Sequence, residues 1–298
     1  WLNPSWTPGR KEELKEFYGG MDTAGWQHEV AGEHGWPSYG AFNIEYLTLC
    51  RQDIPESQRI VITGEELKDC ESEEAVESRL DMLLNLAHLS GTFWVGVDTG
   101  YTNDPTEIVV FKETQEPNER LHLKLVLRVH LEHVAYPHIS ACLALIDRYY
   151  NPAGIGLDNG GNGLSIVQEL ISLDKYRSLG LKDRLRGFDF GSSIPVYLEE
   201  NGAEKKKPAK EYMTSLITGS LQRRELVLPI DDVDIESQFS THTYVMTNGR
   251  VQYSKGNDHI IDAVRCALLI REQFRDDNVW GQTITEIPIP VLTDPIFI

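Results

Sequence analysis

Three strand-like runs joined by short turns constrain the fold of this chain more than any other feature. A buried apolar run starts at Phe93 and ends at Asp98, and two further runs cover 107–112 and 121–131. Short turns between strands favour antiparallel pairing, because parallel neighbours need a longer crossover. The part of the chain that starts at Gly91 is therefore expected to open with an antiparallel meander.

Helices and strands alternate after this meander. The expected elements are a helix at 138–150, a strand ending at Asp158, a helix that follows a Gly-rich turn and runs to 173, a strand at 186–190, a helix at 210–218, an extended piece at 226–229, a hairpin at 244–253 around Asn248-Gly249, and a helix at 259–274. Two earlier helices are expected at 10–18 and 71–88. This order predicts an α/β fold with a ribonuclease H-like mixed sheet, an antiparallel meander plus parallel strands, flanked by helices.

The composition fits most classes of globular protein and argues against one, the simple nucleic-acid-binding proteins. With 41% hydrophobic and 25% charged residues the chain can bury an ordinary core, and its apolar stretches are far shorter than a membrane span. The four cysteines have no CxxC spacing, so zinc and disulfides are not expected. Because the chain begins with Trp1, we expect a piece of a longer protein. The net charge of −18 argues against simple nucleic-acid binding, since Lys and Arg hold a phosphate backbone.

One basic cluster departs from this acidic average. Its members are Lys205, Lys206, Lys207 and Lys210, with Arg223 and Arg224 downstream. Binding depends on local patches more than on net charge, so this cluster is a candidate for contact with a DNA backbone. A flexible, solvated loop is the alternative interpretation.

Three aspartates from distant segments are the main functional signal. Asp98 and Asp158 each end an apolar run, and Asp262 lies near the start of the last amphipathic helix. Carboxylate oxygens on rigid elements are what a divalent metal cluster requires. At Asp98, ordinary turn chemistry is the alternative, because Asp and Gly are common where a strand ends.

The neighbours of these aspartates allow further interpretations. Asp158 precedes a Gly-rich turn that could cradle a phosphate, but the Lys and Ser/Thr of a Walker A loop are missing, so a metal ligand is favoured. His259 and Asp262 share one face of the last helix, three residues apart. Asp258 is a good N-cap for that helix. Asp104 is either a secondary ligand or a turn residue.

Taken together, these motifs resemble the nuclease domain of the large terminase subunit of tailed bacteriophages. The resemblance rests on residues 95–100 with 104–106, 156–163, 219–229 and 258–265. It implies that residues 1–90 are the C-terminal remnant of an ATPase domain and its linker, that residues 91–275 are the nuclease domain, and that residues 276–298 form an extended tail. Walker A and Walker B segments are absent from this sequence, so no ATPase activity is expected.

The resemblance also implies a reaction, a RuvC-type cleavage of concatemeric viral double-stranded DNA. Asp98, Asp158 and Asp262 would be catalytic metal ligands, and His259 an auxiliary ligand or acid/base group. Asp104 and Asp258 are further auxiliary candidates. Two Mg²⁺ or Mn²⁺ ions, roughly 3.5–4 Å apart, would clamp the scissile phosphate. Some relatives have Glu in the second acidic position, where this chain has Asp158.

The same resemblance implies partners for the protein, and two other interpretations of its function stand beside it. The full-length protein would meet a phage portal and a small terminase subunit in the host cytoplasm, with no membrane and outside the mature virion. Little sequence specificity is expected, because no recognition helix rich in Arg, Asn or Gln is apparent. The rival interpretations are another ribonuclease H-like nuclease, of the resolvase or transposase type, and a non-catalytic DNA- or portal-docking module.

Overall fold

The meander lies at the centre of a mixed sheet. A computed structural model describes residues 7–18, 26, 30, 39–100, 104–115, 121–160, 163–198, 204–247, 250–254 and 256–275 of the protein. In it, β4 (Thr92–Asp98), β5 (Thr106–Thr114) and β6 (His122–Glu132) pair antiparallel in chain order. The register places Asp98 opposite Glu107, and Glu107 opposite His130. The predicted meander is confirmed.

Parallel strands extend the sheet on the other side of β4. β7 (Gly154–Asp158) pairs parallel with β4, and β8 (Leu185–Phe188) pairs parallel with β7. The resulting order, β6-β5-β4-β7-β8, with only β5 running against its neighbours, is that of the ribonuclease H-like fold. The predicted fold class is therefore confirmed from the topology of the sheet itself.

Three more strands, two of which the sequence did not reveal, widen the sheet beyond β6. β11 (Leu226–Pro229) pairs with the first part of β6 and with β2 (Arg51–Gln52), and β3 (Gln58–Thr63) pairs parallel with the second part of β6. β2 and β3 precede residue 91, yet they belong to the same eight-stranded sheet. The domain boundary at residue 91 stays a prediction.

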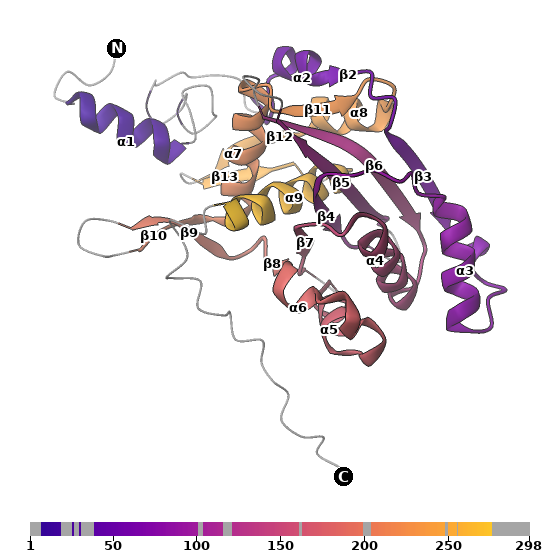
Figure 1. Ribbon diagram of the computed structural model, residues 1–298. Coiled ribbons are helices and arrows are strands. Elements are labelled where there is room, and N and C mark those ends of the chain that lie inside the picture. Colours follow the sequence, from indigo (N-terminus) through magenta and orange to yellow (C-terminus); the bar gives the residue numbers. More distant parts are fainter. Residues whose placement is uncertain are drawn as a thin grey trace, which may run out of the picture.

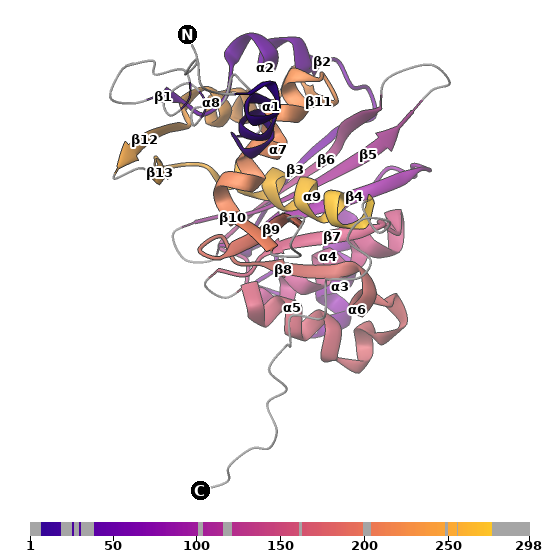
Figure 2. The same cartoon turned by 90° about the vertical axis from the view of Figure 1, so that its left-hand side faces the viewer.

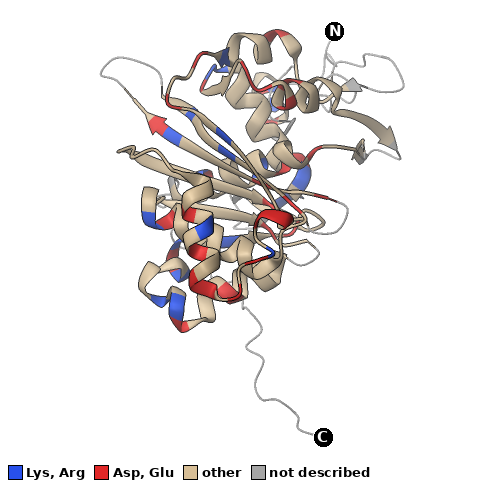
Figure 3. Ribbon diagram, turned by 90° about the vertical axis from the view of Figure 1, so that its right-hand side faces the viewer, with Lys and Arg blue, Asp and Glu red and all other residues tan. Residues whose placement is uncertain are grey.

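Helices cover both faces of the sheet (Figures 1 and 2). The core of one face contains α3 (Glu73–Leu84), α4 (Tyr136–Tyr150) and α5 (Gly163–Ser172). The core of the other face contains α2 (Ile44–Cys50), α7 (Ala209–Gln222), α8 (Val233–Thr241) and α9 (His259–Arg275). The helices that face the viewer in Figure 3 carry both acidic and basic segments. In the described part of the chain, no helix is both long and apolar enough to cross a membrane.

Two glycines let α9 approach the sheet unusually closely. A Cβ on Gly96 of β4 would overlap the carbonyl oxygen of Ala263, and a Cβ on Gly156 of β7 would overlap that of Cys266. Only glycine leaves room for the backbone of a helix at this separation. The first turns of α9 therefore lie over the ends of β4 and β7.

Two small sheets flank this core. β9 (Ser193–Leu198) and β10 (Glu204–Pro208) pair antiparallel, so interpreting the basic stretch as a loop was wrong: three of its lysines lie on a strand. β12 (Thr243–Thr247) and β13 (Arg250–Tyr253) form the predicted hairpin, with β1 (Tyr39–Gly40) on its edge. The predicted turn residues Asn248 and Gly249 and the tail 276–298 lie outside the described residues.

The remaining elements are short or peripheral. They are α1 (Pro8–Tyr18), which the sequence predicts, two 3-10 helices, η2 (Gly64–Glu66) and η3 (Asp174–Leu179), and α6 (Leu181–Arg184). All four cysteines are free.

Candidate functional site

Asp98 and Asp158 lie side by side at the ends of neighbouring strands. The parallel register of β4 and β7 pairs Val97 with Leu157, so the two aspartates follow at the same level of the sheet. Asp98 is 5% exposed, whereas Asp158 is half-buried and accepts a hydrogen bond from the backbone N–H of Gly160 (2.9 Å). The continuous apolar run of each strand keeps it buried up to its final side chain.

Asp262 comes to this edge from the first turns of α9. It is 8% exposed, and both of its carboxylate oxygens are held by protein cations. The guanidinium of Arg265, one turn later on α9, donates to Oδ1. The ammonium of Lys210, at the start of α7, donates to Oδ2 (3.1 Å) and to Oδ2 of Asp258 (3.3 Å).

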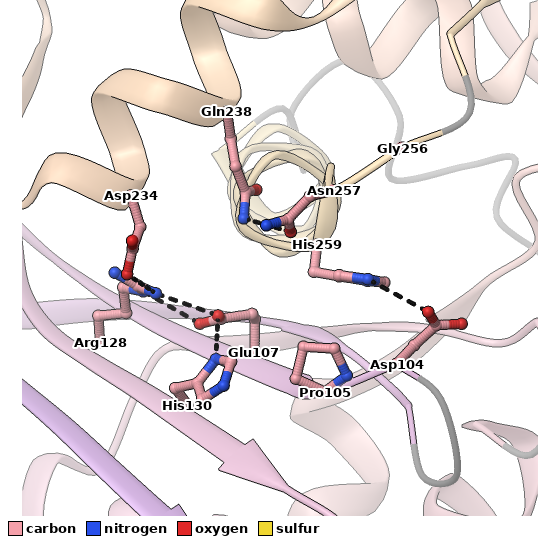
Figure 4. Close-up of a pocket in the computed structure, with 10 residues that line it drawn as sticks. All are labelled: Asp104, Pro105, Glu107, Arg128, His130, Asp234, Gln238, Gly256, Asn257 and His259. Carbon is pink, nitrogen blue, oxygen red and sulfur yellow. Dashed lines mark hydrogen bonds and ion pairs between the residues drawn. The ribbon is translucent and has the colours of Figure 1, made fainter.

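His259 joins two of the predicted acids. Its Nδ1 donates to Oδ2 of Asp98 (2.8 Å), and its Nε2 lies 3.6 Å from Oδ1 of Asp104 (Figure 4). The side chain of Asp104 is 68% exposed. Thr106 holds the backbone of Gly100, because its hydroxyl accepts from the N–H of that residue (3.0 Å) and donates to its carbonyl (2.9 Å).

The N-terminus of α9 is capped by a residue that sequence reasoning missed. Oε1 of Gln238, on α8, accepts from the backbone N–H of Ile260 (2.9 Å). The side chain of Asp258, predicted to be an N-cap, points its carboxylate at Lys210 instead, although its backbone carbonyl accepts from the N–H of Asp262 (2.9 Å). The start of α9 is thus held by groups from α7 and α8.

The carboxylates of this edge disfavour each other's ionisation. Burial is the main cause of a raised pKa at Asp98, to about 7, with the negative charges of Asp262 and Asp158 adding to it. Burial likewise raises the pKa of Asp158, and Asp262 adds to the effect. The hydrogen bond to Asp98 raises the pKa of His259. Such mutual repulsion is typical of sites that bind a cation or exchange a proton.

The chemistry of the three aspartates, but not their placement, is that of a site for a hard divalent cation. Asp98, Asp158 and Asp262 offer oxygen ligands on rigid elements. The pKa values of the first two are raised mainly by burial, and the charge of Asp262 adds to both shifts. Among the residues that the structure describes, no three His, Cys, Asp or Glu side chains are placed to share one metal ion. In this structure the ammonium of Lys210 forms an ion pair with the carboxylate of Asp262.

The residues of the predicted basic cluster do not lie together. The lysines lie on β10 and at the start of α7, and the two arginines follow the end of α7. Lys206 is exposed on β10 and Lys207 is buried on the same strand, where burial lowers its pKa to about 8. Lys205 is half-buried, and Lys210 contacts the acids. Arg223 and Arg224 follow the C-terminus of α7, roughly 20 Å from Lys210 at 1.5 Å per helical residue. The structure does not bring these two arginines to the acids.

A pocket of about 510 Å³ opens beside the site (Figure 4). His259 and Asp104 line it on the side of the acids, and Glu107, Arg128 and His130 line it from the sheet. The guanidinium of Arg128 is buried and donates to Glu107 (3.1 and 3.2 Å) and to Asp232 (2.7 Å). Sequence reasoning missed this network, although the polar residues Arg128 and His130, at alternate positions of an otherwise apolar strand, were the available signal.

Comparisons with known proteins give matches by structure. No family model matches the chain. No curated protein matches it. Similar solved structures include the large terminase nuclease from thermophilic phage G20c with bound magnesium (16% identity, TM-score 0.43, 60% of this chain and 80% of that one). Another is the nuclease domain of the large terminase of Thermus phage P74-26 (16% identity, TM-score 0.41, 59% and 77%).

A longer protein matches as well. The large terminase from another thermophilic bacteriophage is 13% identical with a TM-score of 0.48 over 89% of this chain, which spans about half of that protein (52%). These structures are of the class of protein that the sequence motifs resemble. The order and direction of its own strands identify this chain as a protein with the ribonuclease H-like fold.

Proposed function

We propose that this chain is a divalent-metal-dependent endodeoxyribonuclease, the nuclease part of a viral genome-packaging terminase. The observation that carries the proposal is the meeting of Asp98, Asp158 and Asp262 at one edge of the sheet. Two of them end paired strands, and the third is brought over those ends by the close packing of α9 on Gly96 and Gly156. Segments far apart in the chain thus bring three carboxylates so close that the charge of Asp262 raises the pKa of Asp98 and of Asp158, which supports this proposal.

The proposed chemistry is phosphodiester hydrolysis in a two-metal site. Mg²⁺ or Mn²⁺ ions held by the three aspartates would activate water and offset charge on the phosphate. His259 is positioned by the hydrogen bond between its Nδ1 and Asp98, and its Nε2 faces the pocket and Asp104. In this orientation Nε2 can accept or donate a proton near the reacting phosphate.

The proposed substrate is concatemeric double-stranded DNA, cut with little sequence specificity. The exposed Lys206 on β10 is a candidate for backbone contact, which positions DNA without reading its sequence. In the full-length protein, a portal and a small terminase subunit are the proposed partners, and the host cytoplasm is the proposed location.

Mn²⁺-dependent nicking of plasmid DNA tests the proposal. Asp98→Asn, Asp158→Asn and Asp262→Asn should each reduce nicking by at least about 100-fold, because each removes a charged ligand from the site. The matched control is Asp174→Asn, since this aspartate is 85% exposed on η3, beside Arg177. Wild-type rates in the three site variants, with melting temperatures preserved, would exclude a nuclease centred on these residues.

A non-catalytic DNA- or portal-docking module is the second candidate. The observation that favours it is the pairing of both Asp262 oxygens with protein cations, as expected of a structural acid. This candidate predicts no divalent-dependent nicking by the wild type.

A further inference from the structure

The two cations on Asp262 are held very differently. The side chain of Arg265 is 0% exposed, whereas that of Lys210 is 29% exposed. Arg265 shares α9 with Asp262, but Lys210 reaches across from α7. One oxygen of the Asp262 carboxylate therefore has a fully buried partner, and the other has a partner that is partly open to solvent.

Arg265 is fixed by a network behind the site. Its Nε donates to the hydroxyl of Thr214 (3.0 Å), and its Nη2 lies 3.0 Å from Nε2 of His242. Burial and the neighbouring Arg265 lower the pKa of His242 to about 4, so this imidazole is neutral and Nε2 accepts. The guanidinium also lies 5.1 Å from the ring centre of Tyr253. Moving it would break all of these buried contacts together.

Lys210 is attached by fewer and weaker contacts. Its ammonium donates to Asp262 (3.1 Å) and Asp258 (3.3 Å) and lies 5.5 Å from the ring centre of Phe190. A lysine ammonium sits on a flexible four-carbon stem and forms no bidentate pair, so it can be exchanged for another cation at small cost. Its positive charge also offsets the negative charge of Asp158, whose pKa it lowers.

We propose that Lys210 is a displaceable internal cation, which occupies the Asp262 carboxylate until a divalent ion replaces it. Arg265 keeps its contact with Oδ1, which keeps the carboxylate oriented. Oδ2 loses its hydrogen bond from the ammonium of Lys210 and binds the metal instead. The inference rests on the proposed function, because it assigns Lys210 a role in loading that metal site. Lys210 is thus a positioning residue that sets metal affinity through competition, and it contributes no ligand.

Mn²⁺ affinity tests this competition directly. The free-ion signal in electron paramagnetic resonance gives the Kd for wild type, Lys210→Met and Lys68→Met, without any turnover. We expect Lys210→Met to bind Mn²⁺ roughly tenfold more tightly, about 1.4 kcal/mol, because no ammonium has to leave. Lys68→Met removes the same charge from a side chain that is 58% exposed and should change the Kd less than about twofold, because salt screens exposed charges.

A structure of the wild type with Ca²⁺ provides the second measurement. With Ca²⁺ bound, Nζ of Lys210 should lie more than about 4 Å from Oδ2 of Asp262, beyond ion-pair reach, while Arg265 keeps its contact. Lys210 still paired with Asp262 beside a bound ion, or an equal Kd in wild type and Lys210→Met, would overturn this inference and leave the nuclease proposal intact. Absence of divalent binding in every variant would overturn both.

Discussion

At the scale of the residue, the metal-free protein disfavours the ionised form of Asp98. Burial and the charges of Asp262 and Asp158 raise its pKa from the ordinary 3.8 to about 7, although His259 donates to it. Between pH 3.8 and about 7, the carboxyl group of Asp98 therefore keeps its proton in the folded protein, whereas the unfolded chain has lost it. Such strain is commonly retained at active sites, where a ligand relieves it.

This shift predicts how stability depends on pH. The native state binds more protons than the unfolded state between about pH 4 and 7, so the free energy of unfolding in EDTA should fall as pH rises through that range. His259, whose pKa is also raised, acts in the same direction. Asp98→Asn should flatten this slope and stabilise the metal-free protein by about 1–3 kcal/mol at pH 8. Urea unfolding at pH 4, 6 and 8 measures both, and an unchanged slope would refute the assignment.

At the scale of the element, the position of α9 decides whether the site exists. The helix carries His259 and Asp262, and its backbone lies against Gly96 and Gly156. A larger residue at either glycine must push α9 away from the strands that carry Asp98 and Asp158. The geometry of the site thus depends on packing more than on the acids themselves.

Gly96→Ala tests this dependence. The new Cβ would overlap backbone atoms of Ala263 and Ala267, so we expect a loss of about 1–3 kcal/mol in the free energy of unfolding. Mn²⁺ affinity should fall with it, because Asp262 moves with α9. Gly256→Ala is the matched control, since a Cβ there meets no atom within 4 Å. Equal stability of the two variants in thermal or urea unfolding would show that α9 does not pack as described.

Elements with a long apolar pattern could be predicted from the sequence, and short ones could not. The meander, α4, α7 and α9 follow clear periodicities, whereas β2 and β3 are short edge strands whose residues alternate poorly. The lysines of β10 resembled a loop because pairing with β9, and not composition, makes them a strand. For the site, the acids could be predicted from their places at element ends. The contacts of Lys210, Gln238 and Arg265 with the site could not, because the fold creates them.

At the scale of the whole molecule, charge opposes the proposed substrate. The chain carries a net charge of −18, so DNA binding should be weak in EDTA and stronger with Ca²⁺, which offsets the aspartates without supporting rapid cleavage. If Lys206 contacts the DNA backbone, Lys206→Gln should reduce the slope of log K against log salt by about 1. Lys68→Gln, which removes a lysine paired with Glu65, should leave it unchanged. Fluorescence anisotropy across a salt series distinguishes these outcomes, and equal slopes would remove β10 from the DNA surface.

The most direct test of the central claim is a crystal of this chain soaked in Mn²⁺ and measured at the manganese absorption edge. The account predicts anomalous density among Asp98, Asp158 and Asp262, with Lys210 displaced from Asp262. The same soak of Asp98→Asn should lose or weaken that density. Empty density between the three aspartates at millimolar Mn²⁺, with all three side chains ordered, would contradict a metal-dependent nuclease at this site.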